Sequence, residues 1–396
     1  MAEDRVRLAV VGARRGGSFI QQAQLLENVE LAAVCDTNPE VLDRWREKCP
    51  DAQFFDEYQE LLAADVCDAV MIATPPTLHA EQSIQALDAG RHVLVEVISG
   101  MTVDEIWDVV RAVERNECVY MMAENVCYYR TNLMVQNMVQ QSVFGELTYA
   151  VCGYVHDCKP LIAVHDGKGT WRYEWQFERR GNFYPTHAIG PVAWWLDLGR
   201  SDRMVSMVSM DSPSLSFQAH LKSDSVPNGH PSREETRGTT LPDLNKTLIK
   251  TERGRIIDLW FDVNSSRPHM TTTPFMLQGM NGVYDNDFGR NEYVYLKDRT
   301  DGWGSLWDFA DEFEHPLWKE HLEDVKNAGH GGADYFTLLE FARSVTEGTP
   351  SPIDVYDAAD WSAIIPLSQE SVLNGSQPVE FPDFRMVSAT SVKDSV

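Results

Sequence analysis

The first hundred residues alternate short apolar runs with helical patterns, and this alternation limits the fold more than any other feature of the chain. The apolar runs have the length of strands and cover residues 6–11, 30–35, 69–73 and 92–96. A helical pattern extends from the first run to Leu26, and another over 79–89 ends at Gly90. Such alternation is typical of a parallel sheet with right-handed crossovers. We therefore predict an α/β domain over residues 1–125.

The loop after the first apolar run has the composition of a nucleotide-binding turn. It carries Gly12, Gly16 and Gly17. Arg14 stands where the G-x-G-x-x-G fingerprint has its second glycine. Asp36 follows Gly12 by 24 residues, near the spacing of about 20 at which an acidic group meets the adenosine ribose. No arginine comes directly after Asp36, and its carboxylate would repel a ribose phosphate, so NAD is favoured over NADP. A glycine-rich turn without a nucleotide is the alternative.

From residue 126 the pattern changes, and we predict a second domain over 126–396. Its strand-like segments are 144–154, 203–210, 247–251 and 255–263, and its helical segments are 130–141, 333–347 and 356–373. Residues 211–245 are rich in Ser, Pro, Asn and charge, which is typical of a long loop. Trp303, Trp307 and Trp318 either wall a sugar pocket or belong to a helix packed on the core.

The stretch Gly181–Pro191 combines two groups that can move protons. Tyr184 precedes His187 by three residues, just ahead of an apolar run. If Thr186 caps a helix, Pro191 falls near its first turn. The phenol and the imidazole then face the same way and can act as acid and base. The alternative is a buried pair in which each side chain satisfies the other's hydrogen bond.

The net charge limits the classes of partner that are expected, and the cysteines indicate the cellular compartment. Lys and Arg number 34 against 60 Asp and Glu, a formal net charge of −26, so neither nucleic acid nor an anionic membrane is expected as a partner. The seven cysteines are scattered without a Cys-x-x-Cys pair, which favours reduced thiols over a disulfide framework or a zinc site. No signal peptide is recognised, and we expect a cytoplasmic protein without a bound metal.

Three segments in this order resemble the Gfo/Idh/MocA oxidoreductases, namely 73–79, 93–96 and 144–147. The resemblance implies an N-terminal Rossmann domain and a C-terminal α+β domain with a large, mostly antiparallel open sheet. In that superfamily the active site has a lysine directly after the position of Glu96 and an aspartate four residues before that of His187. Here these positions hold Val97 and Phe183, which disfavours an ordinary sugar dehydrogenase.

A narrower set of motifs is similar to the NAD-dependent glycosidases of glycoside hydrolase family 109, whose type activity is α-N-acetylgalactosaminidase. These motifs are Glu96-Val97, 123–125, 153–157, Trp171-Arg172, 181–187 and 352–359. They occur in both expected domains and in the order of that family. The resemblance implies bound NAD, a small carbohydrate or glycoside as the substrate, and a homo-oligomer.

The same resemblance implies roles for particular residues. Together with Gly12 of the glycine loop, NAD contacts are implied for Arg15, Gly16, Asp36, Pro76, Thr77, Leu78, His79, Glu96, Val97 and Asn125. Sugar contacts are implied for Tyr154, Arg172, Tyr184, Pro185, Thr186 and His187, and for His269, which stands where the family often has a tyrosine. The alternatives are a helix cap for His79, simple packing for Tyr154, and a surface ion pair of Arg172 with Glu174 or Glu178.

In such enzymes bound NAD⁺ oxidises carbon 3 of the sugar, the ketone acidifies the proton on carbon 2, and the group on carbon 1 is eliminated. Water then adds and NADH returns the electrons, so the net reaction is hydrolysis without the carboxylate pair of ordinary glycosidases. We expect His187, Tyr184 and Tyr154 to transfer protons and Arg172 to hold sugar oxygens. A dehydrogenase that oxidises carbon 3 without cleavage and a non-catalytic dinucleotide sensor are the alternative functions.

Overall fold

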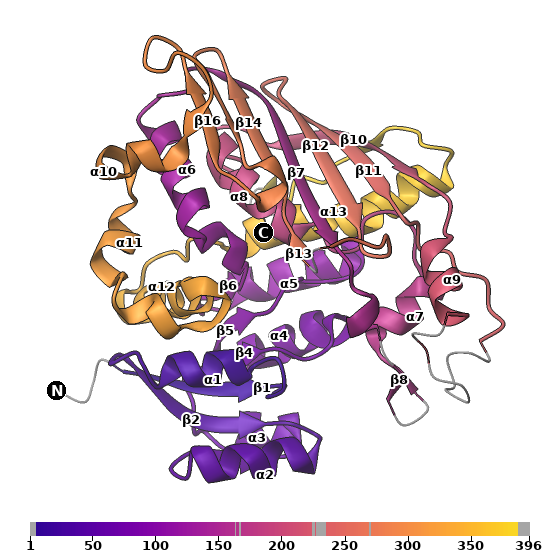
Figure 1. The fold of residues 1–396 in the computed structure, drawn as a ribbon. Coiled ribbons are helices and arrows are strands. Elements are labelled where there is room, and N and C mark those ends of the chain that lie inside the picture. The colour runs from indigo at the N-terminus through magenta and orange to yellow at the C-terminus, as the bar shows by residue number, and fades with distance from the viewer. Residues whose placement is uncertain are drawn as a thin grey trace, which may run out of the picture. The chain divides into compact units, whose positions relative to one another are not determined.

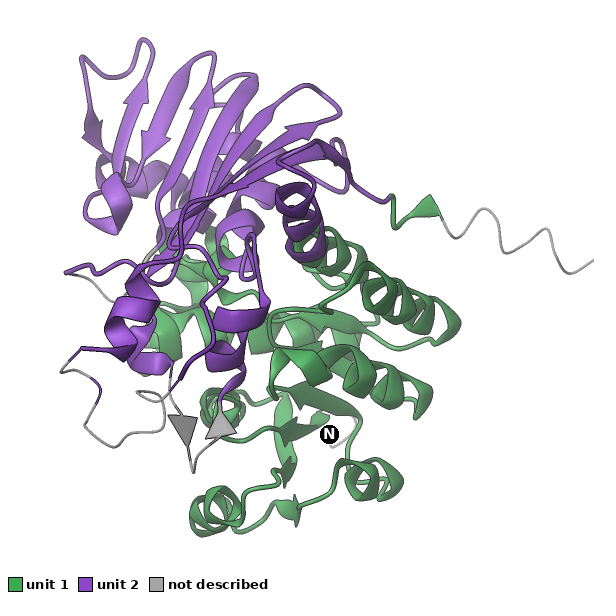
Figure 2. Ribbon diagram, turned by 90° about the vertical axis from the view of Figure 1, so that its right-hand side faces the viewer, with its two compact units in different colours: residues 1–130, 315–363, 383–396 green, residues 131–314, 364–382 purple. Residues whose placement is uncertain are grey.

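The computed structural model describes residues 5–162, 164–165, 168–223, 226, 235–268 and 271–386. The chain forms two compact units, each made of separate parts of the sequence. Unit 1 contains residues 1–130, 315–363 and 383–396, and unit 2 contains 131–314 and 364–382. Figure 1 labels most of the helices and strands, and Figure 2 colours unit 1 green and unit 2 purple. The domain boundary expected at residue 125 stays a prediction.

Unit 1 is built on a parallel sheet of six strands in the order β3-β2-β1-β4-β5-β6. The strands are β1 (Val6–Val11), β2 (Val29–Cys35), β3 (Gln53–Phe55), β4 (Ala69–Ile72), β5 (His92–Val95) and β6 (Tyr120–Met122). The central strands are apolar on both faces and largely buried, as strands covered by helices on both sides are. The strand order reverses between β1 and β4, and nucleotides bind at the carboxyl ends of strands at such a point. The predicted parallel α/β sheet is confirmed.

The helices of unit 1 come from both ends of the chain. The amino-terminal ones are α1 (Gly17–Ala23), α2 (Pro39–Lys48), α3 (Tyr58–Ala63), η1 (Pro76–Leu78), α4 (His79–Asp88), α5 (Val103–Arg115) and η2 (Asn125–Tyr128). The later ones are α11 (Pro316–His321), η7 (Asp324–Asn327), η8 (Gly329–Gly332), α12 (Ala333–Glu347) and α13 (Val355–Leu373), whose last residues belong to unit 2. The helix α12 packs against α1 and η2, so residues more than 300 positions apart share one core.

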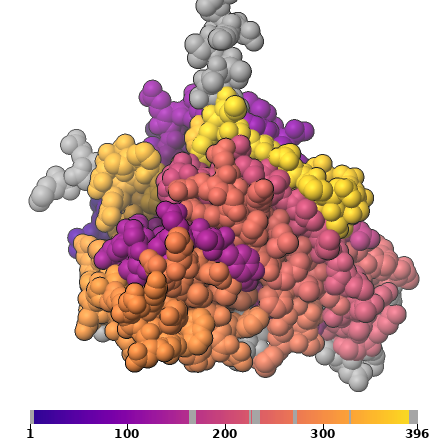
Figure 3. Space-filling view, turned by 90° about the horizontal axis from the view of Figure 1, so that it is seen from above, coloured from indigo at the N-terminus to yellow at the C-terminus, as the bar shows by residue number. Residues whose placement is uncertain are grey.

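Unit 2 contains a large sheet of ten strands, and all pairs except β7–β12 are antiparallel. The strands are β7 (Leu147–His156), β10 (Met204–Asp211), β11 (Asn245–Thr251), β12 (Ile256–Asp262), β13 (Thr271–Thr272), β14 (Phe275–Gly279), β15 (Gly282–Asp285), β16 (Tyr293–Leu296), β17 (Gly304–Ser305) and β18 (Val379–Glu380). In Figure 3 the magenta residues near β7 lie among the orange residues of the later strands, since β7 pairs with β14. The predicted open, mostly antiparallel sheet is confirmed.

The remaining elements of unit 2 are short, apart from α6 and α8. They are α6 (Arg130–Gln140), η3 (Lys159–Leu161), the pair β8 (Val164–His165) and β9 (Lys168–Gly169), α7 (Trp171–Glu178), α8 (Thr186–Leu196), α9 (Ser216–Leu221), η5 (Asp287–Gly289), η6 (Leu306–Phe309) and α10 (Ala310–Phe313). The helix α9 lies inside the stretch expected to be a long loop. Among the described residues, none of the helices has the length and apolar character needed to cross a membrane.

Candidate functional site

Glycines shape the loop that follows β1 in unit 1. Gly12 has a φ of +83°, and a Cβ there would lie 2.6 Å from the Ala73 carbonyl oxygen, so glycine is required. A Cβ on Gly16 would lie 2.5 Å from Cγ1 of Val10. The two glycines let the backbone of the loop pass this close to β1 and to the residue after β4.

Asp36 holds the same loop from the end of β2. Its Oδ2 accepts the Ala13 N–H at 2.8 Å, and its Oδ1 accepts the Asn38 N–H at 2.9 Å. The Trp45 indole donates to the Ala13 carbonyl at 3.0 Å. Asp36 remains partly exposed, and a carboxylate has enough lone pairs to accept ribose hydroxyls as well.

A buried histidine fixes the turn Pro76–His79 after β4. Nδ1 of His79 lies 2.8 Å from the Ile98 carbonyl oxygen, and Nε2 lies 2.8 Å from that of Thr74. Burial lowers the pKa of His79. Both ring nitrogens thus face backbone carbonyls of the protein itself. The side chain connects the segment after β4 to the segment after β5, so His79 does more than cap a helix. Thr77 and Leu78 are exposed and are the side chains of the turn that can meet a ligand.

The buried carboxylate of Asp334, at the start of α12, connects the predicted cofactor residues. It accepts hydrogen bonds from the Ser18 hydroxyl and, at 2.8 Å, from Nδ2 of Asn125. Nη1 of Arg15 lies 3.5 Å from the same carboxylate. Nη2 of Arg15 also pairs with Oε1 of Glu96 at 2.5 Å. One carboxylate from the last third of the chain thus joins Arg15 of the glycine loop to Asn125, the first residue of η2.

His330 enters this cluster from the loop before α12. Its Nδ1 lies 2.8 Å from Oδ2 of Asp334, and this hydrogen bond raises the pKa of His330. Burial alone would raise the pKa of Asp334, but the hydrogen bond with His330 and the charge of Arg15 lower it below its usual value. Asp334 is therefore ionised, and His330 gains a proton more readily than a free imidazole does.

The arrangement of unit 1 fits a dinucleotide. Asp36, the Pro76–His79 turn, Glu96 and Asn125 follow β2, β4, β5 and β6, and the glycines follow β1. They therefore gather at the carboxyl edge of the sheet, around the reversal of strand order, with Arg15 as a cation in the glycine loop. The residue after Glu96 is Val97 rather than a lysine, and its side chain is buried.

In unit 2, three rings that were predicted to transfer protons lie together. The centroid of the Tyr154 ring is 5.0 Å from that of Tyr184 and 5.5 Å from that of His187. The rings of Tyr184 and His187 are 5.2 Å apart in a T-shaped arrangement. Tyr154 and Tyr184 are buried, whereas His187 is partly exposed. All other residues from 181 to 193 are buried. The sequence spacing predicted the pairing of Tyr184 with His187, and the sheet adds Tyr154.

The local backbone around Tyr184 is fixed by α13. Gly181 has a φ of +75°, and a Cβ there would lie 2.5 Å from Oγ of Ser368. The Asn182 N–H donates to the same Ser368 hydroxyl at 2.9 Å, and the Asn182 side chain accepts the Tyr184 N–H at 3.1 Å. Phe183 packs edge-on against Phe261, with ring centroids 4.9 Å apart. The position that carries aspartate in ordinary dehydrogenases is therefore a core position here.

The start of α8 corrects one expectation. Thr186 is the first residue of the helix rather than its cap, and the capping position is Pro185, without a side-chain hydrogen bond. The backbone of Pro185 is already helical, at φ −81° and ψ −23°, and its carbonyl accepts the N–H groups of Ala188 and Ile189. Pro191 accordingly lies inside the helix, beyond the first turn, where it has no N–H to donate to the His187 carbonyl.

Arg172 lies beside these rings, and it forms no ion pair with Glu174, Glu178 or any other described residue. Its guanidinium is 4.0 Å from the centroid of the Trp171 ring and 5.2 Å from that of Tyr184. Glu174, one of the two partners considered for it, pairs instead with Arg237 at 2.9 Å. A guanidinium stacked on aromatic rings is held as a fixed donor.

Behind Tyr154 lies a second layer of polar groups that the sequence did not assign to the site. The Tyr154 hydroxyl is 2.9 Å from Nδ1 of His156, and Sγ of Cys158 is 2.9 Å from the same nitrogen. Burial, with the charges of Arg172 and His187, lowers the pKa of His156 to about 4, so the ring is neutral. Burial raises the pKa of Cys158 to about 11 and that of Tyr154 well above its usual value. All three groups are therefore uncharged near neutral pH.

Three further residues were expected to contact the sugar, namely Pro185, Thr186 and His269. His269 lies outside the described residues. Pro185 and Thr186 are buried, and Oγ1 of Thr186 has no hydrogen-bond partner in the described part of the chain. Ser18, His330 and Asp334 were missed, although the run Gly-His-Gly-Gly at 329–332 is an unusual signal for a special backbone.

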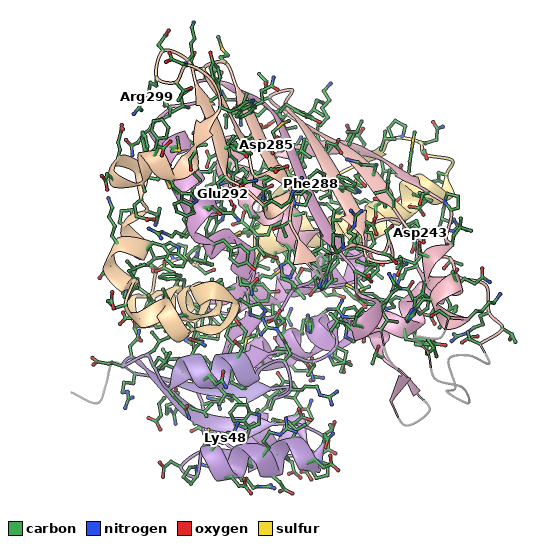
Figure 4. The ribbon with its side chains drawn as sticks, viewed as in Figure 1. Lys48, Asp243, Asp285, Phe288, Glu292 and Arg299 are labelled. Carbon is green, nitrogen blue, oxygen red and sulfur yellow. The ribbon has the colours of Figure 1, made fainter. Side chains whose placement is uncertain are left out.

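The Trp-rich segment has two roles. Trp318 is buried in unit 1, and its indole donates to the Tyr128 carbonyl at 3.0 Å. Trp303 is exposed in unit 2, where it lines a cavity of about 420 Å³ with Tyr293, Asp287 and Asp285, the last of which Figure 4 labels at the end of β15. Trp318 thus belongs to a helix packed on the core, and the sugar pocket stays a prediction.

Comparison with known proteins places this geometry in a family. Residues 6–124 match the family described as "Oxidoreductase family, NAD-binding Rossmann fold", and residues 128–389 match "Glycosyl hydrolase 109, C-terminal domain". A "Glycosyl hydrolase family 109 protein" of Solibacter usitatus is 38% identical over 392 residues, which cover 96% of this chain and 88% of that protein. The "Alpha-N-acetylgalactosaminidase" of Shewanella oneidensis is 36% identical over 399 residues, which cover 96% of this chain and 85% of that protein.

A solved structure agrees in fold. Levoglucosan dehydrogenase in complex with NADH and L-sorbose has a TM-score of 0.77 at 17% identity, and the match covers 96% of this chain and 100% of that one. Family and fold together make the protein an enzyme of the hydrolase or nicotinamide-dependent oxidoreductase type. The chain belongs to glycosyl hydrolase family 109, with an NAD-binding Rossmann fold in its first third.

Proposed function

We propose that the protein is an NAD-dependent glycosidase that cleaves α-N-acetylgalactosaminides or related glycosides by transient oxidation at carbon 3. The observation that carries this proposal is the convergence of Tyr154, Tyr184 and His187 in unit 2. Buried Val97 and Phe183 stand where ordinary dehydrogenases have lysine and aspartate, which supports cleavage over simple oxidation. The name of the Shewanella oneidensis relative supports the choice of sugar.

The proposed cofactor is NAD, held by the glycine loop, Asp36, the Pro76–His79 turn, Glu96 and Asn125. When bound, NAD⁺ supplies the two-electron oxidant for carbon 3 and returns the electrons at the end of the cycle. The partly exposed carboxylate of Asp36 would accept the ribose hydroxyls and repel a ribose phosphate, which supports NAD over NADP. The free thiols of all seven cysteines support a cytoplasmic setting, and a homo-oligomer remains part of the proposal.

Each proton transfer of the proposed reaction has a candidate group in unit 2. His187, partly exposed, takes the proton of the sugar hydroxyl or activates the water that adds later. Tyr184 and Tyr154 serve carbons 1 and 2, one as the acid for the leaving oxygen and one as the base for the carbon-bound proton. The Arg172 guanidinium, stacked on Trp171, donates to sugar hydroxyls or to the ketone oxygen.

His156 sets the direction of the Tyr154 hydroxyl. A neutral ring protonated at Nε2 has one lone pair at Nδ1, so Tyr154 and Cys158 compete to donate to it. When Tyr154 donates to His156, the lone pairs of its oxygen remain available as acceptors. We infer that His156 is a positioning residue that acts through Tyr154.

A double-mutant comparison tests this coupling. We expect Tyr154→Phe to lower kcat by about 10²-fold, because the ring contacts remain while the hydroxyl is lost. His156→Ala should lower kcat by about tenfold, and adding it to Tyr154→Phe should cause little further loss, since both act through one hydroxyl. Tyr149→Phe is the matched control, a tyrosine on the same strand whose hydroxyl lies 3.5 Å from Asp258. Fully additive effects on kcat would contradict the coupling.

The function itself is tested with aryl α- and β-glycosides of N-acetylgalactosamine, galactose and glucose in deuterated water. Elimination and addition predict release of the aryl group, deuterium at carbon 2 of the released sugar and no net NADH. NADH that accumulates in step with a keto-sugar would replace this proposal with a dehydrogenase. Nucleotide binding without any turnover of these glycosides would favour the sensor.

A further inference from the structure

The loop before α12 has a backbone that few sequences can adopt. His330, Gly331 and Gly332 have φ values of 50°, 64° and 98°, all in the left-handed region. A Cβ on Gly329 would lie 2.6 Å from Oγ of Ser18, and one on Gly332 would lie 2.8 Å from Cβ of Val325. Residues other than glycine are uncommon at such a φ, and histidine is one of the few that adopt it more often. The loop is thus built to bring the His330 side chain to one place, beside the start of α1.

Among the ion pairs of the described residues there, the charges of Arg15, Glu96 and Asp334 do not balance without His330. Arg15 is one cation that faces two carboxylates, Glu96 at 2.5 Å and Asp334 at 3.5 Å. Such a cluster carries a net negative charge and would repel an anion. The pyrophosphate is the only anionic part of NAD, and the loop that contains Arg15 is the part of unit 1 proposed to meet it. A protonated His330 makes the cluster neutral.

The orientation of His330 suits this role. Nδ1 is occupied by the fully buried Asp334, which leaves the Nε2–H on the far side of the ring as a donor. Its side chain is 49% exposed, so a bound molecule can reach it. Asp334 itself is held by Ser18 and Asn125, so the imidazole is attached to a rigid base.

We propose that His330, held by Asp334, is a cofactor-binding residue that donates to the pyrophosphate of NAD and slows its dissociation. This inference rests on the proposed use of NAD. It extends the proposed dinucleotide site beyond the amino-terminal residues. The added loop lies more than 200 positions after Asn125, the last of them. The loop would retain the cofactor through repeated catalytic cycles, as a reaction that returns its electrons to the same sugar requires.

The test measures NADH dissociation from the full-length protein. Protein saturated with NADH is mixed with excess NAD⁺, and the loss of bound-NADH fluorescence gives the rate. His330→Asn tolerates the left-handed backbone and can still donate to Asp334, but it lacks the charge. We expect it to release NADH about tenfold faster, the size of one charge-assisted hydrogen bond. His321→Asn, which removes an imidazole paired with Asp324 at 3.0 Å in the same unit, should release NADH at the wild-type rate.

The pH dependence separates this role from a structural one. The charged groups that face His330 are Asp334, Arg15 and Glu96. Arginine and carboxylates keep their charge between pH 6 and 9. The wild-type dissociation rate should therefore rise over that range as His330 loses its proton, whereas that of His330→Asn should stay flat. A flat wild-type profile, or equal rates for the two proteins, would overturn the inference while leaving the proposed function intact. Failure of the wild-type protein to bind NADH would overturn the proposed function itself.

Discussion

Replacing His187 with alanine is expected to reduce turnover of an aryl α-N-acetylgalactosaminide by about 10²–10⁴-fold, the usual contribution of a general acid or base. His187 is partly exposed between buried neighbours, and its ring lies 5.2 Å from that of Tyr184 and 5.5 Å from that of Tyr154. Removing the imidazole takes away the proposed proton-transfer group and leaves the proposed cofactor residues of unit 1 unchanged. Initial rates and the NAD content of the purified protein are the two measurements.

The NAD content decides how a loss of turnover is understood. His187→Ala should retain as much bound nucleotide as the wild type, because none of the cofactor residues lies in unit 2. His220→Ala is the matched control, since His220 is also partly exposed in unit 2 but packs on Phe217 in α9. Unchanged turnover in His187→Ala would remove His187 from the proposed mechanism, and the proton transfers would then fall to Tyr154 and Tyr184.

Replacing Asp334 with alanine is expected to lower the free energy of unfolding by about 3–5 kcal/mol, the range for breaking a buried charged pair. The Asp334 carboxylate is fully buried and accepts from Ser18, Asn125 and His330, with Arg15 nearby. Its loss leaves these donors without their acceptor. Asp324→Ala, which removes an exposed carboxylate paired with His321, should change the stability by less than about 1 kcal/mol.

The ion pair of Asp334 with His330 also predicts how the loss of stability in Asp334→Ala varies with pH. The folded pKa of Asp334 lies below its unfolded value of about 3.9, so its contribution is complete above that pH and is lost as the pH falls through the folded value. The folded pKa of His330 lies above its unfolded value of about 6.5, so its contribution is complete below about 6.5 and is lost as the pH rises through the folded value. Urea denaturation should therefore show the largest difference between wild type and Asp334→Ala from about pH 4 to 6.5. A difference that is the same at pH 5 and pH 9 would contradict this account.

The parts of the fold that the sequence predicted are those with a strong local signal. β4 is a continuous apolar run and β1 is apolar apart from Arg7, because both faces of these strands are buried, and Gly90 follows the end of α4 at a φ of 72°. The strands β14 to β17 were not predicted, because each is only two to five residues long and carries too little local pattern. Their pairing depends on β7, which lies more than 100 residues earlier.

In the candidate site too, residues close in sequence were predicted to lie together, and contacts between distant residues were not. Their spacing of three residues predicted that Tyr184 and His187 lie together, and they do, but Tyr184 precedes α8, so the turn through Pro185 and not a shared helix face brings the two rings together. The place of Tyr154 beside them depends on the sheet, and the resemblance to a family supplied what the spacing could not. Asp334 bonds to Ser18, 316 residues earlier, and no local pattern connects two positions so far apart. Thr186 was assigned to the cap because threonine favours that position, but the helical backbone of Pro185 starts the helix one residue sooner.

The discontinuous make-up of unit 1 has a consequence for how the protein matures. During synthesis, residues 1–130 leave the ribosome long before α12 does, and without Asp334 the side chains of Ser18, Arg15 and Asn125 lack their common acceptor. The nascent Rossmann segment is thus an incomplete folding unit, although its sheet is continuous in sequence. The cluster around Asp334 can therefore be completed only after the final third of the chain has been synthesised.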